Sequence, residues 1–161
     1  MFLLGKTYTM RGEDSLNQLG VIPRAVQYLL SNLPSDSIIT ANYLQIYCEL
    51  ITDLLAPNDS TNITIRETTE KTVYVDGLTE MRIQSIRDLQ VILQNGDKNR
   101  ATSVTNMNLT SSRSHAILLL KVTQKSQPNS NGSSSGEGRD SSKDMGIRST
   151  LVLCDLAGSE R

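Results

Sequence analysis

A short apolar run that ends in a carboxylate and a glycine constrains the fold of this chain more than any other feature. The run occupies residues 151–154, Asp155 follows it directly, and Gly158 comes three positions later. A continuous apolar run of this length is typical of a buried strand. Open α/β sheets bind their ligands outside the carboxyl ends of such strands. The sequence therefore predicts a strand over residues 151–155 that presents Asp155 to a ligand.

A hydroxyl-rich segment precedes this strand and carries one fixed cation, Arg113, among three serines. Hydroxyls donate hydrogen bonds to phosphate oxygens and accept them from water, and the arginine fork requires a carboxylate or phosphate partner. Near the N-terminus, Gly5-Lys6-Thr7 supplies a lysine and a hydroxyl of the kind that reach phosphates and Mg²⁺ in phosphate-binding loops. Together these pieces predict a nucleoside-triphosphate hydrolase whose γ-phosphate moves two loops.

These motifs resemble those of a known family. The pattern N-x-x-S-S-R-S-H from Asn108 and the pattern D-L-A-G-S-E-R from Asp155 are similar to switch I and switch II of the kinesin motor domain. Further similar blocks occur in the same order: Tyr8-Thr9-Met10, Gly20-Val21-Ile22-Pro23-Arg24, Tyr43-Leu44-Gln45-Ile46-Tyr47, Asp53-Leu54-Leu55 and Val75-Asp76-Gly77-Leu78. The resemblance implies an α/β fold, the three-layer α/β/α P-loop NTPase of kinesin type with an incomplete central sheet, over residues 1–161.

The resemblance also implies a role for each candidate site residue. The catalytic group, which surrounds the γ-phosphate and the attacking water, is Ser111, Ser112, Arg113, Gly158 and Glu160. The nucleotide-binding group is Gly5, Lys6, Thr7, Tyr8, Asn108 and Ser114. The Mg²⁺ group is Thr7, Ser112 and Asp155, with Asp155 acting through water. Arg113 and Glu160 are expected to form an ion pair that closes the two switches, and His115 is expected to orient or pack rather than to transfer a proton.

The glycine-rich loop departs from the family pattern. A complete loop needs a further glycine five residues before Gly5, whereas the printed sequence starts at Met1 and has bulky Phe2, Leu3 and Leu4 where small polar residues are expected. We therefore expect an N-terminally truncated motor domain that also lacks its C-terminal third. The first functional hypothesis is a fragment of an ATP-dependent microtubule motor. The alternative is a non-catalytic fragment or interaction module that does not bind ATP productively, and a GTPase is disfavoured because no guanine-reading N-K-x-D occurs.

Composition gives no support for a protein that binds nucleic acid, an anionic membrane or zinc. The net charge of −1 gives no overall basic signal for nucleic acid or an anionic membrane. Two cysteines and one histidine cannot form a typical zinc cage, and both cysteines are expected to be buried thiols. By resemblance the partners are ATP, Mg²⁺ and the microtubule, in the cytoplasm on the cytoskeleton. The parental protein is expected to dimerise through a stalk that this sequence does not contain.

Local patterns predict the remaining elements. Helices are expected over residues 21–33, 49–55 and 85–94, the last with Ser85 as its N-cap and Gly96 beyond its end. Strands are expected over residues 38–47 and 116–123, with a small hairpin formed by residues 63–65 and 73–75. Residues 126–144 are rich in Ser, Gly and Asn, which predicts a disordered surface insert.

Overall fold

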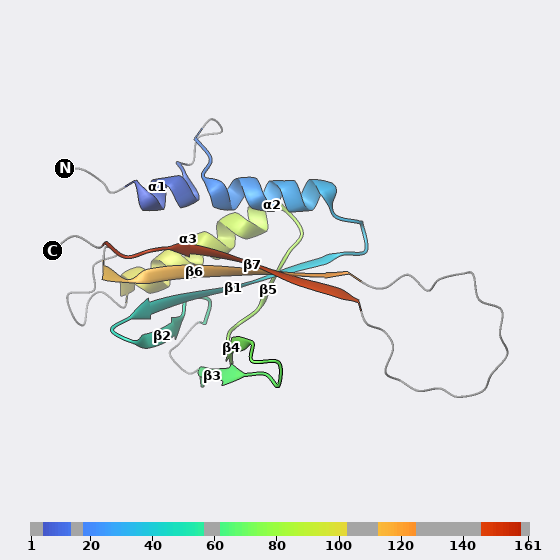
Figure 1. Cartoon of the computed structure of the whole chain (residues 1–161). Helices are drawn as coiled ribbons and strands as arrows, with labels where there is room; N and C mark the ends of the chain where they lie inside the picture. The colour runs from blue at the N-terminus through green and yellow to red at the C-terminus, as the bar shows by residue number, and fades with distance from the viewer. Residues whose placement is uncertain (1–4, 14–17, 57–61, 103–112, 125–145, 159–161) are drawn as a thin grey trace, which may run out of the picture.

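The main sheet is built around two ten-residue strands. A computed structural model describes residues 5–13, 18–56, 62–102, 113–124 and 146–158. Strand β1 (Ile38–Tyr47) pairs antiparallel with β6 (His115–Gln124), which pairs antiparallel with β7 (Ile147–Asp155). Strands β2 (Leu50–Asp53) and β5 (Met81–Ile83) both pair with the other edge of β1, which gives a five-stranded sheet (Figure 1).

The described helices pack on one face of this sheet. They are α1 (Lys6–Arg11), α2 (Val21–Asn32) and α3 (Ile86–Thr102), drawn above and behind the strands in Figure 1. Alternate residues of the strands join the helices in one apolar core: Ile39, Ala41, Tyr43, Ala116, Leu118, Leu120 and Leu153, packed with Ile22, Val26, Leu89 and Ile92. The period of two along each strand places these side chains on the same face. The apolar patterns that predicted α2, β1, β6 and β7 therefore correspond to one continuous core.

The predicted helix over residues 49–55 is wrong. Cys48 and Glu49 form a two-residue turn with positive φ values of 46° and 65°, and the chain folds back as β2 along the end of β1. Primed turns with two positive φ values are favoured in two-residue hairpins, because their twist matches that of the strands. The same turn corrects a second prediction, since it leaves Cys48 exposed, whereas Cys154 is half-buried and both thiols are free.

The third predicted helix is present but longer than expected. Its start agrees with the prediction, because Ser85 and Asp88 exchange hydrogen bonds in a reciprocal cap. Its end does not, because Gly96 lies inside α3 and is buried against the ring of Tyr43. Gly96 thus serves close packing between α3 and β1 and does not end the helix.

The predicted small hairpin is confirmed as β3 (Thr64–Glu67) and β4 (Val73–Asp76). It is a separate two-stranded sheet, below the main sheet in the view of Figure 1. The predicted insert at residues 126–144 lies outside the described residues. Among the described helices, none is long and apolar enough to cross a membrane.

Candidate functional site

The start of α1 meets the carboxyl end of β7 at one end of the main sheet. The Thr7 hydroxyl donates a hydrogen bond of 2.7 Å to Asp155 Oδ2, and Lys6 Nζ donates one of 3.0 Å to the carbonyl of Ala157. These pairs join residues 148 and 151 positions apart in the chain. The fold therefore brings the predicted lysine, hydroxyl and carboxylate together in space.

Asp155 has the properties of a ligand-binding carboxylate. Its residue exposure is 6%, and its second oxygen, Oδ1, is buried without a hydrogen-bond partner among the described residues. A buried carboxylate oxygen without a partner is costly in a folded protein unless a cation or water meets it. The neighbouring Cys154 is kept as a neutral thiol, because partial burial and then the Asp155 charge raise its pKa.

A groove of about 400 Å³ lies beside these groups. Its lining residues come from α1 and from the end of β7: Gly5, Lys6, Thr9, Met10, Cys154, Asp155 and Leu156. Tyr8 is half-exposed and borders a different groove, next to Gly20 and Arg24. The structure thus brings Gly5, Lys6 and Asp155 to one groove, and Thr7 reaches the site through its hydrogen bond to Asp155. Tyr8 lies at the other groove, so its nucleotide role remains a prediction.

The first residue of β6 contacts the segment after β7. The Ala157 backbone N–H donates a 3.1 Å hydrogen bond to His115 Nδ1, so both polar groups of Ala157 are engaged, one by His115 and one by Lys6. Gly158 follows directly. This contact supports the orienting role expected for His115, since an accepting Nδ1 on a neutral ring holds the backbone in place.

Ser114 is held by a residue that the sequence patterns did not single out. Arg100, in the last turn of α3, donates to the Ser114 hydroxyl at 2.8 Å and to its carbonyl at 2.9 Å. Ser114 is 2% exposed, so its position is set by these bonds. A basic residue shortly before a hydroxyl-rich segment was the available signal, but only the fold shows which serine it reaches.

The other candidate residues divide into two groups. Arg113 is described and exposed, at the start of the chain segment that leads into β6. Those outside the described residues are Asn108, Ser111, Ser112 and Glu160. The predicted Arg113–Glu160 ion pair therefore remains a prediction.

Comparison with known proteins gives one consistent match. A family model described as the kinesin motor domain matches residues 4–161. The chain is 37% identical over 164 residues to kinesin-like protein unc-104 of Caenorhabditis elegans, covering 98% of this chain and 10% of that protein. It is 37% identical over 169 residues to kinesin-related protein 5 of Dictyostelium discoideum, covering 98% of this chain and 16% of that protein.

A solved structure of a fast kinesin is similar to this chain with a TM-score of 0.77 and 33% identity. The match covers 98% of this chain and 42% of that one. Similarity over nearly the whole chain confirms the α/β fold that the motifs predicted. This chain spans about a tenth to a sixth of the length of the two relatives named above.

Proposed function

This chain belongs to the kinesin motor-domain family, and we propose that it is part of an ATP-hydrolysing motor that moves along cytoplasmic microtubules. The activity, the substrate and the filament partner are proposals here, because the chain covers a small share of its relatives. The observation that carries the proposal is a groove lined by Lys6 and Asp155, with the Thr7 hydroxyl bonded to the Asp155 carboxylate. A lysine, a hydroxyl and a carboxylate are the groups that bind a triphosphate with its metal ion.

The residues at this groove fit Mg²⁺. The Thr7 hydroxyl and the Asp155 carboxylate are hard oxygen donors, and Asp155 Oδ1 is buried without a partner among the described residues. Mg²⁺ usually keeps several waters and takes one or two protein ligands beside the phosphates, so a large protein cage is not needed. When bound, Mg²⁺ would neutralise charge that develops on the phosphate oxygens.

Nucleotide binding would change the contacts of one peptide group, that of Ala157, which Lys6 and His115 both contact. Lys6 Nζ contacts the Ala157 carbonyl at 3.0 Å, so binding of phosphates by Lys6 requires it to leave that carbonyl. His115 would keep hold of the Ala157 N–H, and Gly158 next to it would be free to turn toward the γ-phosphate. Hydrolysis would then depend on positioning the water and stabilising charge, with roles for Ser111, Ser112, Arg113 and Glu160 as the resemblance implies.

Binding of a fluorescent ATP analogue with and without Mg²⁺ tests the site. We expect saturable, Mg²⁺-dependent binding that Asp155→Asn weakens by about ten- to a hundredfold, as for residues that support a metal ion through water. Asp36→Asn is the matched control, because Asp36 is an exposed carboxylate just before β1, at the opposite end of that strand from the groove, and it should leave binding unchanged.

Hydrolysis measured with and without microtubules tests the rest of the proposal. We expect microtubules to raise the turnover of the protein that contains this chain. Saturable binding without hydrolysis would contradict the motor function but keep the nucleotide site. Absence of saturable binding would favour the non-catalytic alternative, in which Lys6 remains on the Ala157 carbonyl.

A further inference from the structure

Helix α1 carries two of the predicted phosphate-binding groups but has no fully buried side chain. Lys6 and Thr7 lie in its first turn, and Met10, near its end, is only partly buried against the apolar core. A helix of six residues is too short to be stable by itself, so contacts with the rest of the protein must set its direction. The orientation of Lys6 and Thr7 therefore depends on how the ends of α1 are held.

The end of α1 is held by the guanidinium group of Arg11. Its Nη1 donates a hydrogen bond to Asp97 of α3, and its Nη2 donates one to the hydroxyl of Tyr43 of β1. The Arg11 side chain is 17% exposed. An arginine can bind two acceptors at once, because its N–H donors point in fixed directions from one planar group. Arg11 therefore attaches the end of α1 to both the main sheet and α3.

The two partners of Arg11 differ in how firmly they can hold it. The Asp97 side chain is 51% exposed, so water screens its attraction for the guanidinium. Tyr43 is buried, which raises the pKa of its hydroxyl and keeps it neutral, and its ring packs against Gly96 of α3. A hydrogen bond from a charged donor is stronger where water is excluded. The bond to Tyr43 is therefore the firmer of the two.

The contact of Arg11 with Asp97 also involves the helix that leads toward the switch segment. Asp97 and Arg100 are three positions apart in α3, so they lie on neighbouring turns of the same side of the helix. Arg100 donates to the hydroxyl and to the carbonyl of Ser114. The phosphate-binding helix and the serine predicted to bind nucleotide are therefore both attached to α3.

We propose that Arg11 is a positioning residue that holds the start of α1 in the direction needed to bind the phosphates of a nucleotide. The inference rests on the proposed function for its ligand and on the described contacts of Arg11 for its geometry. Arg11 lies five residues after Lys6, about 7.5 Å along the helix axis, and is not among the residues that line the nucleotide groove. Loss of its contacts would let α1 tilt, which would displace Lys6 and Thr7 from bound phosphates.

Arg11→Met is the first test variant, because methionine keeps a long unbranched side chain but has no N–H donor. The Thr9 and Gly12 amides donate to the carbonyls of Gly5 and Tyr8, and without nucleotide their hydrogen exchange should rise by about tenfold. In the protein that contains this chain, affinity for a fluorescent ATP analogue with Mg²⁺ should fall by about tenfold. A merely structural role would lower stability but leave the affinity of the folded protein unchanged.

Tyr43→Phe is the second variant if Arg11→Met does not fold. It removes only the hydroxyl and keeps the ring that packs against Gly96. It should shift both measurements in the same direction but by less, because Asp97 still holds Arg11. In a protein that carries both Tyr43→Phe and Asp97→Ala, Arg11→Met should have little further effect on affinity, because neither acceptor of Arg11 is left.

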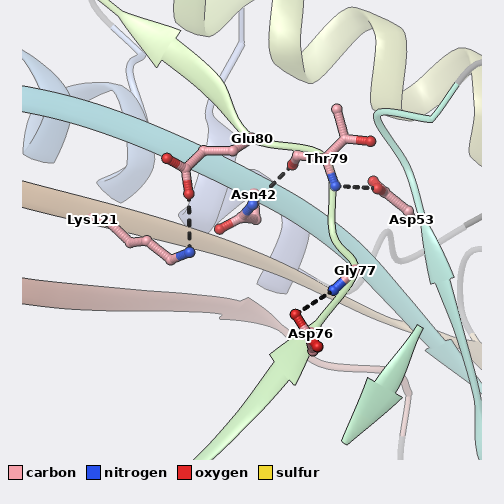
Figure 2. Close-up of polar contacts among 7 residues, drawn as sticks. All are labelled: Asn42, Asp53, Asp76, Gly77, Thr79, Glu80 and Lys121. Carbon is pink, nitrogen blue, oxygen red and sulfur yellow. Dashed lines mark hydrogen bonds and ion pairs between the residues drawn. The ribbon is translucent and has the colours of Figure 1, made fainter. Parts of the chain in front are cut away.

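Lys121→Met is the matched control. Lys121 Nζ forms an ion pair of 3.0 Å with Glu80, and the two side chains are 45% and 46% exposed (Figure 2). The substitution also replaces one paired cation by methionine, but in the half of β6 that lies away from the groove. Because exposed ion pairs contribute little, it should change neither the exchange of the α1 amides nor the affinity for the nucleotide.

The possible outcomes separate the steps of the proposal. A folded Arg11→Met protein with unchanged exchange in α1 would overturn the role of Arg11 in holding the helix. Faster exchange with unchanged affinity, in a parent protein that binds the ATP analogue, would overturn its role in positioning. An undiminished effect of Arg11→Met in the Tyr43→Phe, Asp97→Ala protein would show that Arg11 does not act through these partners. A parent protein that does not bind the analogue would instead refute the proposed function.

Discussion

Replacement of Gly96 by alanine has two effects of opposite sign on the free energy of unfolding. Gly96 lies inside α3, where alanine is favoured over glycine by about 1 kcal/mol. An added Cβ, however, would lie 2.1 Å and 2.3 Å from two ring carbons of Tyr43. Ordinary carbon contacts are about 3.5–4.0 Å, so the helix or the ring must move by more than 1 Å.

The ring of Tyr43 has little freedom to move. Tyr43 is 2% exposed, its hydroxyl accepts a hydrogen bond from Arg11, and the same guanidinium lies 5.7 Å from the ring centroid and pairs with Asp97. Overpacking of a rigid site costs about 1–3 kcal/mol, and this site belongs at the upper end of that range. The net expectation for Gly96→Ala is a destabilisation of about 2 kcal/mol after the helix term is subtracted.

Urea unfolding at equilibrium measures the outcome as a lower midpoint with an unchanged slope. The matched background is Tyr43→Val, which removes the ring but keeps a residue that suits a strand. In that background Gly96→Ala should stabilise the protein by about 1 kcal/mol, because only the helix term remains. A stable Gly96→Ala protein, or an equal penalty in both backgrounds, would refute the steric argument.

Three further predictions address the turn, a helix cap and the switch segment. Glu49→Gly should raise the unfolding free energy by about 0.5–1 kcal/mol in urea unfolding, because Glu49 has a positive φ of 65° that glycine adopts freely; a loss of stability would contradict this. Hydrogen bonds from the Gln84 and Ser85 backbone to Asp88 lower its pKa below 3.8, so its stabilising effect is present above pH 3.8 and is lost as pH falls below that value. Below that pH the free energy of unfolding should therefore fall less steeply in Asp88→Asn than in the unchanged protein. An equal dependence on pH in the two proteins would exclude the effect. His115→Ala removes the acceptor of the Ala157 N–H and should speed exchange of that amide by about tenfold, whereas unchanged exchange would show that another group holds it.

Local sequence patterns were sufficient to predict the elements that depend only on residues close together in the chain. The helical period of α2, the apolar strands β1, β6 and β7, and the Ser85 cap all follow from interactions between residues close in sequence. The motifs at Lys6, Thr7 and Asp155 likewise predicted a shared site, because the chemistry of binding phosphate and Mg²⁺ needs those groups together.

Tertiary structure decided the features that depend on a distant neighbour. The turn at Cys48 takes an unfavourable backbone conformation because pairing of β2 with β1 compensates for it. Position 96 requires glycine inside the helix because Tyr43 leaves no space for a side chain there. The bonds of Arg100 to Ser114 and of Asp53 to Thr79 are likewise set by folding. Propensity and periodicity report only on neighbours along the chain, whereas close approach between separate elements is determined by how the whole core packs.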